Sequence, residues 1–336
     1  MREFLIRKNI RFTLERYGFE TMNYMTLGLF SSLIVGLILK TIGSWLDWEW
    51  LVEVGALAQS GMGAAIGVGV AYGLQAPAMI IFSSAIVGSL AISVGGGPVG
   101  AFVAVAISSE LSKLVYKTTP IDIIVTPATA LISGVFIAQV VAPYLGELMV
   151  ATGQTIEWAI TLQPFFMSIV IAVVMGMVLT GPTSSAAVAI SLNLSGLAAG
   201  AATIGCCAQM VGFAAMSYKE NGPSGVLGIG LGTSMLQLPN IIRNPLIWLP
   251  PILSSAVLAP IGTLVFQMQN IPTGAGMGTS GLVGQVGTLA AMGQSGSVWL
   301  AIALMQFILP AVLCLALSRY MYYKGWIKTG DLRLKT

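Results

Sequence analysis

Long apolar stretches of membrane-spanning length run through most of this chain, and they leave few folds open to it. Between residues 24 and 319 the apolar runs reach about 20 residues, the length that a helix needs to cross a bilayer. Charged residues make up 8% of the 336 residues, whereas a soluble domain has about 25%. Because lipid offers the backbone no hydrogen-bond partner, such segments fold as helices. The sequence therefore predicts an all-α polytopic membrane protein.

The apolar stretches divide into ten candidate spans, and the charges between them indicate an orientation. Basic residues lie at both ends of the chain and near Lys113 and Lys219, whereas acidic residues lie in the turns at 47–53 and 147–157. The positive-inside rule assigns the basic segments to the cytoplasm, so ten spans place both termini inside and the acidic turns outside. The candidate spans are residues 24–44, 53–73, 76–94, 98–116, 123–145, 159–180, 184–197, 199–217, 245–267 and 297–319.

Two basic segments flank the predicted membrane domain, residues 24–319. In residues 1–23, basic side chains such as Arg7 and Lys8 alternate with apolar ones, a pattern typical of an amphipathic helix on the membrane surface. We expect this helix to anchor the cytoplasmic face, and a regulatory contact is the alternative. Residues 320–336 form a basic cytoplasmic tail.

A glycine-rich string of pattern GxGxGTSxL occurs twice, at residues 228–236 and 274–282. Each copy follows an asparagine and a proline. Paired apolar segments that are interrupted by Gly and Pro indicate the binding site of a transporter. We predict two re-entrant hairpins, 222–240 and 270–295, which enter the membrane from opposite faces and meet near its middle.

The glycines of these strings have two interpretations. Without a side chain, a glycine lets backbone amides approach a ligand closely, and the Thr-Ser pair adds two hydroxyl groups. Alternatively, glycines let helices pack tightly, which is our interpretation of the glycine run at 61–73. For the duplicated strings we favour a ligand site, because packing alone does not require the same Thr-Ser pair twice.

Polar side chains within apolar sequence complete the candidate substrate site. Amide side chains both donate and accept hydrogen bonds, as the binding of an uncharged polyol requires, although each amide can instead bond across a helix pair. Arg243 is surrounded by Pro and Asn, and it is either a site residue or a topology anchor. The predicted substrate-binding residues are Gly230, Gly232, Thr233, Ser234, Gln237, Asn240, Arg243, Gly276, Gly278, Thr279, Ser280, Gln285 and Asn193.

Several kinds of chemistry are not expected from this sequence. It contains no His, which is the commonest metal ligand and the usual proton shuttle. No acid–base pair or nucleophile–base set can be assembled, so we expect no catalytic residue, metal or cofactor, and no nucleic-acid partner. The three cysteines, Cys206, Cys207 and Cys314, lie in apolar stretches and are interpreted as small buried residues.

The chain resembles the membrane (IIC) component of the sugar phosphotransferase system, in the branch of perfringolysin O regulator-like proteins (EIIC type 2). The resemblance lies in the basic amphipathic N-terminus, the apolar spans, the string Gly-Pro-Thr-Ser-Ser at 181–185 and the string at 271–284. It implies a IIC-like transporter fold, a homodimer and a bacterial inner (cell) membrane location. It also implies a cytoplasmic IIB protein, with its IIA donor, that phosphorylates the sugar as it passes.

The chain differs from the glucose-type members of this resemblance. In those members a Glu in a characteristic loop and a His contact the sugar, whereas this chain has no His and neither glycine string contains an acid. No catalytic residue is therefore transferred to this sequence.

Two functions follow from these observations. The first is a permease that binds a small polyhydroxy solute such as a sugar, and that translocates it by alternating access. The alternative is a membrane-embedded regulator that senses a ligand and has kept the IIC fold without coupled transport. An ion channel is less favoured, because neither rings of acids nor an ordered carbonyl filter is evident.

Overall fold

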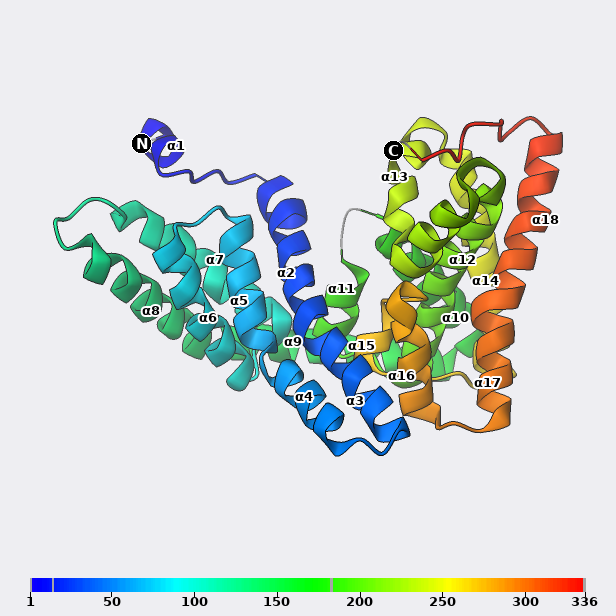
Figure 1. Ribbon diagram of the computed structural model, residues 1–336, viewed down its shortest axis with the longest axis horizontal. Coiled ribbons are helices and arrows are strands. Elements are labelled where there is room, and N and C mark those ends of the chain that lie inside the picture. The colour runs from blue at the N-terminus through cyan, green and yellow to red at the C-terminus, as the bar shows by residue number, and fades with distance from the viewer. Residues whose placement is uncertain (1, 14, 182–183, 335–336) are drawn as a thin grey trace. The chain divides into compact units, whose positions relative to one another are not determined.

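The computed structural model describes residues 2–13, 15–181 and 184–334. The chain is helical, and these residues contain no β-strand (Figure 1). It divides into two compact units, Met1–Ala151 (unit 1) and Thr152–Thr336 (unit 2). This division falls inside the single membrane domain that was predicted over residues 24–319.

Unit 1 begins with a short helix, which a long helix and several further helices follow. Its first long helix, Glu15–Trp45, has 31 residues and combines η1, α2, η2 and α3. The elements are α1 (Arg2–Arg7), η1 (Glu15–Thr21), α2 (Met22–Leu29), η2 (Phe30–Ile34), α3 (Val35–Trp45), α4 (Glu49–Ser60), α5 (Met62–Gly73), α6 (Ala78–Ser93), α7 (Gly97–Val115), α8 (Asp122–Val140) and the first part of α9 (Ala142–Leu162).

The glycine run of α5 brings three helices together, as the packing interpretation predicted. A Cβ at Gly67 would overlap the Ser84 carbonyl of α6, and one at Gly69 would overlap the Tyr24 carbonyl of α2. A Cβ at Gly63 would lie 2.7 Å from Cα of Ser89. Small residues let backbones approach to this extent in membrane helices, and the packing role of this run is confirmed.

The N-terminal segment is not one continuous helix, in contrast to the prediction for residues 1–23. Helix α1 ends at Arg7, and the helical structure resumes at Glu15. Asn9 has a positive φ of 56°, and such a residue does not continue an α-helix. Lys8 Nζ donates to the carbonyl of Tyr116 at 2.5 Å, so this segment is bound to the turn after α7 instead. Met1 and Leu14 lie outside the described residues.

Unit 2 is organised around one long buried helix. Its elements are the rest of α9, α10 (Pro164–Thr180), α11 (Ser185–Ser191), α12 (Gly196–Leu227), η3 (Gly228–Gly232), η4 (Ser234–Gln237), α13 (Leu238–Arg243), η5 (Pro245–Trp248), α14 (Leu249–Leu264), α15 (Pro272–Ala275), η6 (Ser280–Leu282), α16 (Val283–Met292), α17 (Gly296–Ile302), η7 (Ala303–Ile308) and α18 (Leu309–Tyr323). Glycines of α12 allow close contacts on two sides, because a Cβ at Gly205 would overlap the Ala172 carbonyl and one at Gly200 the Met268 carbonyl. Gly222, with φ 62° and ψ −166°, kinks this helix just before Pro223.

Among the described residues, six helices are long and apolar enough to cross a membrane, or seven if the bent pair α4–α5, with an angle of 46°, is one span. Helices α6 and α10 are apolar but have 16 and 17 residues. The segment 184–197, which was expected to be a span, forms only the seven-residue α11, and such a helix is about 10 Å long at 1.5 Å per residue. It therefore cannot cross a bilayer by itself, and the count of ten spans stays a prediction.

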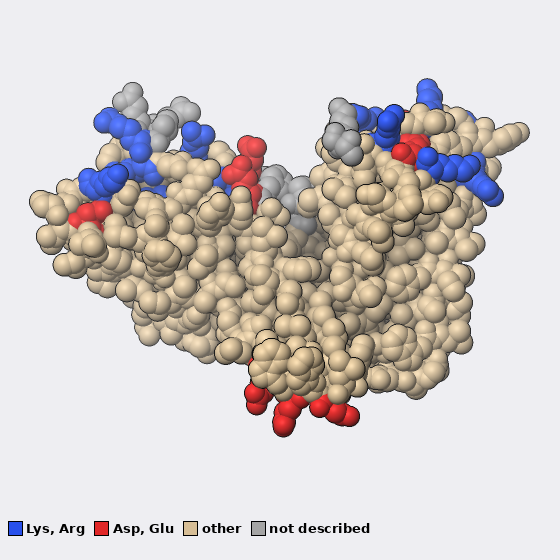
Figure 2. All heavy atoms as spheres, viewed as in Figure 1, with Lys and Arg blue, Asp and Glu red and all other residues tan. Residues whose placement is uncertain are grey.

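In each unit, taken by itself, the basic side chains visible in Figure 2 gather at one end. In unit 1, Lys113 Nζ donates to the Leu74 carbonyl at 2.6 Å, which ties α7 to the turn after α5. In unit 2, Tyr322 at the end of α18 donates to Glu220, beside Lys219. Ser195, at the opposite end of α12, donates to Glu157 at 3.0 Å. Basic side chains thus gather at one end of each unit, and acidic side chains such as Glu20 and Glu220 lie there as well.

Candidate solute site

The two glycine strings lie in contact within unit 2. Thr279, next to η6 in the second string, donates a hydrogen bond from its hydroxyl to the carbonyl of Gly230, in η3 of the first string. Each string lies where a helical segment is interrupted. The first breaks at Thr233, whose backbone is extended (φ −156°, ψ 139°), and the second breaks between α15 and α16. The two strings are therefore in contact, whereas their entry into a membrane from opposite faces and their meeting near its middle stay predictions.

The second string is packed on its glycines. A Cβ at Gly276 would overlap the carbonyl of Ser185, and the Ser185 hydroxyl donates to the Gly276 carbonyl at 2.5 Å. Gly278 has a φ of 53°, which L side chains rarely adopt, and its Cβ would lie 2.8 Å from the Cys206 carbonyl carbon. These contacts leave no room for a ligand, so the glycines of this string serve close packing against α11 and α12.

The first string is open on its glycines. A Cβ at Gly230 would meet only the side chain of Ala214, at 3.4 Å. A Cβ at Gly232 would have no neighbour within 4 Å among the described residues, and Gly232 is exposed. Its carbon and amide can therefore be approached by a bound molecule. The backbone-approach role that was predicted for both strings has room only here.

A chain of polar side chains leads from the first string into the helices behind it. The hydroxyls of Ser234 and Thr180 lie 2.8 Å apart, and Thr180 donates onward to Oε1 of Gln209 at 3.2 Å. The indole Nε1 of Trp248 donates to the same oxygen at 2.9 Å. Gln209 is fully buried, and its Nε2 has no hydrogen-bond partner in the part of the chain that the structure describes. A buried donor without an acceptor costs about 1–3 kcal/mol, so this amide favours an added oxygen.

A second amide network supports the second string. Gln285 donates to Gln306 at 2.8 Å, and Gln306 donates to Thr288 at 3.0 Å. Asn270, which the sequence reasoning did not include in the site, donates to Thr203 at 2.6 Å and to the Gly284 carbonyl at 2.9 Å. The feature of the sequence that points to Asn270 is its position, because an asparagine precedes each of the two strings. Gln285 retains one buried oxygen without a partner.

Four other predicted site residues lie away from the contact between the strings. Gln237 donates to the Leu332 carbonyl at 2.9 Å, and Asn240 donates to Gln237 at 2.8 Å and to the Arg333 carbonyl at 3.0 Å. Both amides thus hold the C-terminal tail. Arg243 is exposed, and no carboxylate among the described residues pairs with it. Asn193 is also exposed, in a turn with a positive φ of 49°.

The remaining predicted residues have structural contacts. Thr233 accepts a hydrogen bond from the Met235 amide and so caps η4. Ser280 is partly buried beside Thr279, and its amide donates to the Met277 carbonyl at 3.0 Å. The three cysteines are free and buried, as predicted. Pro182 and Thr183, in the first of the two strings that carry the family resemblance, lie outside the described residues.

The described part of the chain contains no group of three Cys, Asp or Glu side chains that is suited to hold a metal ion. The chemistry available at the strings is hydrogen bonding by backbone amides, hydroxyls and the Gln209 amide. Such groups bind neutral polar molecules rather than activating a nucleophile.

Comparison with known proteins gives one match, to the family model described as "Phosphotransferase system, EIIC", over residues 19–334. No curated protein and no solved structure matches the chain. The matched residues include both units and both glycine strings. Taken with the apolar helices, this match shows that the chain is a multi-pass membrane protein and belongs to the EIIC family of the phosphotransferase system.

Proposed function

We propose that this protein is a permease that binds a small polyhydroxy solute, such as a sugar, beside the first glycine string and moves it across the membrane by alternating access. Membership of the EIIC family makes the chain a membrane sugar-transport component of the phosphotransferase system. The proposal adds the site, the class of solute and the mode of movement. On the basis of the sequence, it also assigns the chain to the branch of perfringolysin O regulator-like proteins, and it holds that this chain still transports its solute.

The contact between the two strings carries this proposal. The packed second string provides a rigid support, because Gly276 and Gly278 lie against the backbone of Ser185 and Cys206. Thr279 connects that support to the first string through the Gly230 carbonyl. The first string has free space at Gly232. Sites that are held by a rigid second layer bind more strongly, since less ordering is required on binding.

The groups around the open string fit a polyhydroxy solute. In the proposed site, Gly230, Gly232 and Thr233 offer backbone groups, and Ser234 offers a hydroxyl. Behind them, the free Nε2 of Gln209 supplies a donor for a hydroxyl oxygen. Gly276, Gly278, Thr279, Ser280 and Gln285 act as the supporting layer. The proposed direct contact excludes Gln237 and Asn240, because both hold the tail, and it does not use Arg243 and Asn193.

We infer the arrangement in the membrane from charge. The basic ends of the two units would face the cytoplasm of a bacterium, so both termini would lie on the cytoplasmic side of the inner membrane. The hairpins 222–240 and 270–295 would be re-entrant, and two copies of the chain would form a dimer. The membership implies partners such as a IIB component, which would phosphorylate the sugar on the cytoplasmic side.

Binding and uptake by matched variants test the proposal. The purified protein is screened against mono- and disaccharides by thermal shift, and bound sugars are then assayed for uptake into proteoliposomes. We expect Gly232→Val to lower sugar affinity at least tenfold without lowering Tm. Gly296→Val is the control, because Gly296 is also exposed with no neighbour within 4 Å for a Cβ among the described residues.

Equal sugar affinity in the two variants would show that the first string is not part of the sugar site. A protein that binds a sugar at the string but shows no uptake, with or without a IIB protein and its phosphoryl donor, would contradict the permease and support the sensing regulator.

A further inference from the structure

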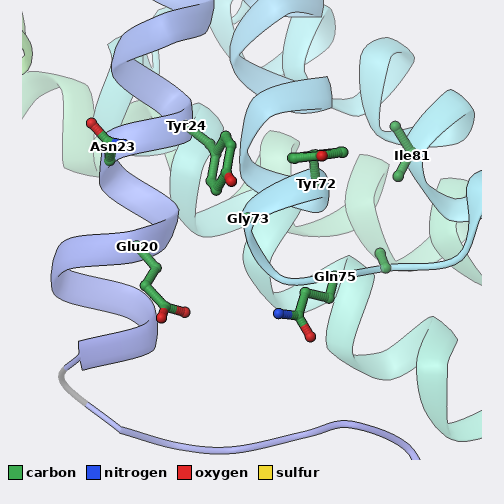
Figure 3. A pocket seen from close by; sticks show the side chains of 8 residues that line it. Glu20, Asn23, Tyr24, Tyr72, Gly73, Gln75 and Ile81 are labelled. Atoms are coloured by element: carbon green, nitrogen blue, oxygen red, sulfur yellow. The ribbon is translucent and has the colours of Figure 1, made fainter.

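Unit 1 contains a cavity that the transport proposal does not use. Its volume is about 590 Å³, within the range of about 300–1,000 Å³ that is typical of small-molecule sites. It lies between the start of the first long helix, the end of α5 and the start of α6 (Figure 3). Its lining residues are Glu20, Asn23, Tyr24, Tyr72, Gly73, Gln75, Ala76 and Ile81.

One wall of the cavity is aromatic. Tyr24 of α2 and Tyr72 of α5 lie with their ring centroids 4.9 Å apart and their planes at 70°. The glycines of α5 permit this arrangement, because a Cβ at Gly73 would lie 2.8 Å from Cα of Thr21 and 3.0 Å from the Tyr24 ring. The close crossing of the two helices thus sets the rings side by side.

The opposite wall is polar and held in place. Gln75 has a φ of 55°, and its Oε1 accepts a hydrogen bond from Asn9 at 2.9 Å. The neighbouring Leu74 carbonyl is bonded by the side chains of Arg16 and Lys113, both of which are buried. The Gln75 side chain lines the cavity, and its Nε2 can donate a hydrogen bond there. In Figure 3 the Gln75 and Glu20 side chains extend into the same space.

Glu20 gives the cavity its charge. Its carboxylate has no ion pair in the described part of the chain, and no Lys or Arg lines the cavity. A smaller cavity of about 300 Å³ shares Glu20 and Gln75 and adds Arg11 and Arg16. Arg16 is engaged with Asn9 and Leu74, and the acidic Glu15 lines the same space. A negative group in the large cavity would therefore lie beside the Glu20 carboxylate, in a lining that contains no Lys or Arg.

We propose that this cavity is a second solute site, which binds an uncharged polyhydroxy ring and disfavours the phosphorylated form. The apolar face of such a ring packs on Tyr24 and Tyr72, while its hydroxyls donate to Glu20 and accept from Gln75. The inference takes its solute class from the proposed function, but it concerns a different unit and different residues. A transporter that phosphorylates its solute would thereby distinguish substrate from product by charge.

Calorimetric titration of the full-length protein in detergent tests the site. The probes are glucose, N-acetylglucosamine, maltose and cellobiose, with glucose 6-phosphate as the charged counterpart. We expect two binding events for the sugar that binds, and we expect Glu20→Gln and Tyr72→Leu each to weaken one of them at least tenfold. Glu53→Gln and Tyr144→Leu are the controls, because both residues are exposed in unit 1 away from the cavity.

The outcomes separate this site from the glycine strings. A binding event that is lost in Glu20→Gln and kept in Gly232→Val supports the second site. This holds even if Gly232→Val has no effect on any binding event. A single event that only Gly232→Val removes would overturn the second site and leave the transport proposal standing. Absence of binding by all four sugars would overturn it as well. If glucose 6-phosphate binds at the Glu20-dependent site as tightly as glucose does, the proposed selection by charge is wrong.

Discussion

The two glycine strings have the same pattern and opposite surroundings. At matching positions, Gly232 is exposed and open, whereas Gly278 has a φ of 53° and lies against the Cys206 backbone. Leu236 lies in η4, a 3-10 turn, whereas its counterpart Leu282 has a positive φ of 60°. A duplicated motif therefore does not have duplicated roles. One copy forms a packed support, and the other leaves its backbone accessible.

The two hairpins are also held in different ways. The second is packed on backbone atoms of α11 and α12. The first is held by the C-terminal tail, whose Leu332 is fully buried. Glu220 accepts hydrogen bonds from Tyr322 and from the amides of Gly330 and Leu332, at 3.0–3.2 Å. Hydrogen bonds to a charged carboxylate are worth about 1.5–3 kcal/mol each, whereas the second hairpin is held by close backbone packing, so we expect the first hairpin to be released more easily.

The largest expected effect is on stability at the second string. Gly278→Ala forces a side chain onto left-handed backbone and into the backbone of Cys206. We expect a loss of about 2–4 kcal/mol, since strained φ/ψ and overpacking each cost about 1–3 kcal/mol. Thermal unfolding in detergent measures it. An unchanged Tm would show that this string is not the rigid member of the pair.

The next effect is on the tail that holds the first hairpin. Glu220→Ala removes the acceptor of three hydrogen bonds, so we expect the tail to open more easily by about 1–3 kcal/mol. Hydrogen exchange at the Gly330 and Leu332 amides measures the opening, with Glu53→Ala as an exposed control. Faster exchange in the α15–α16 hairpin instead would contradict the contrast between the hairpins.

A smaller effect is expected at the link between the strings. Thr279→Val keeps the shape of the side chain and removes its hydrogen bond to Gly230. We expect this loss to lower the free energy of unfolding by about 0.5–1.5 kcal/mol. Thr233→Val is the comparison at the matching position of the first string, where the side chain only caps η4. We expect Thr279→Val to lower Tm more and to weaken sugar binding. The reverse order would indicate that the first string supports the second.

The smallest stability effect belongs to Gly232→Ala. Its Cβ would have no neighbour within 4 Å among the described residues, and surface changes of this kind stay within about 0.5 kcal/mol. Unfolding of this variant beside Gly278→Ala compares the same substitution at equivalent positions. A similar loss of Tm in both would show that the two strings are packed alike.

Several features were predictable from the sequence because they depend on local chemistry. Glu110 and Lys113 are three positions apart on one helix, a spacing that favours pairing, and they form an ion pair at 3.2 Å. The glycine run of α5 packs helices, and the helical, apolar character of the chain follows from its composition. The break at Gly222 coincides with the predicted start of the first hairpin. Each of these depends on residues that are neighbours in sequence or on one helix face.

The roles of the polar side chains were not predictable in this way. Gln237 and Asn240 resemble ligands in sequence, yet they bond carbonyls of residues 332 and 333, nearly one hundred positions away. Asn221 and Asn270 occupy matching places before the two strings, but Asn221 bonds the tail and Asn270 bonds α12 and α16. An amide bonds whichever partner packing brings to it, so its role depends on contacts that are remote in sequence.

By itself, the sequence determined a helical membrane protein with charge separated between its ends and with two glycine-rich interruptions. Those properties follow from hydropathy and backbone freedom, which act over a few residues. Only the tertiary structure decided that one string is buried and the other open, that the tail holds the first hairpin, and that unit 1 has a polar aromatic cavity. The physical reason is that space around a glycine is set by the helices packed against it, and the glycine's own sequence does not encode them.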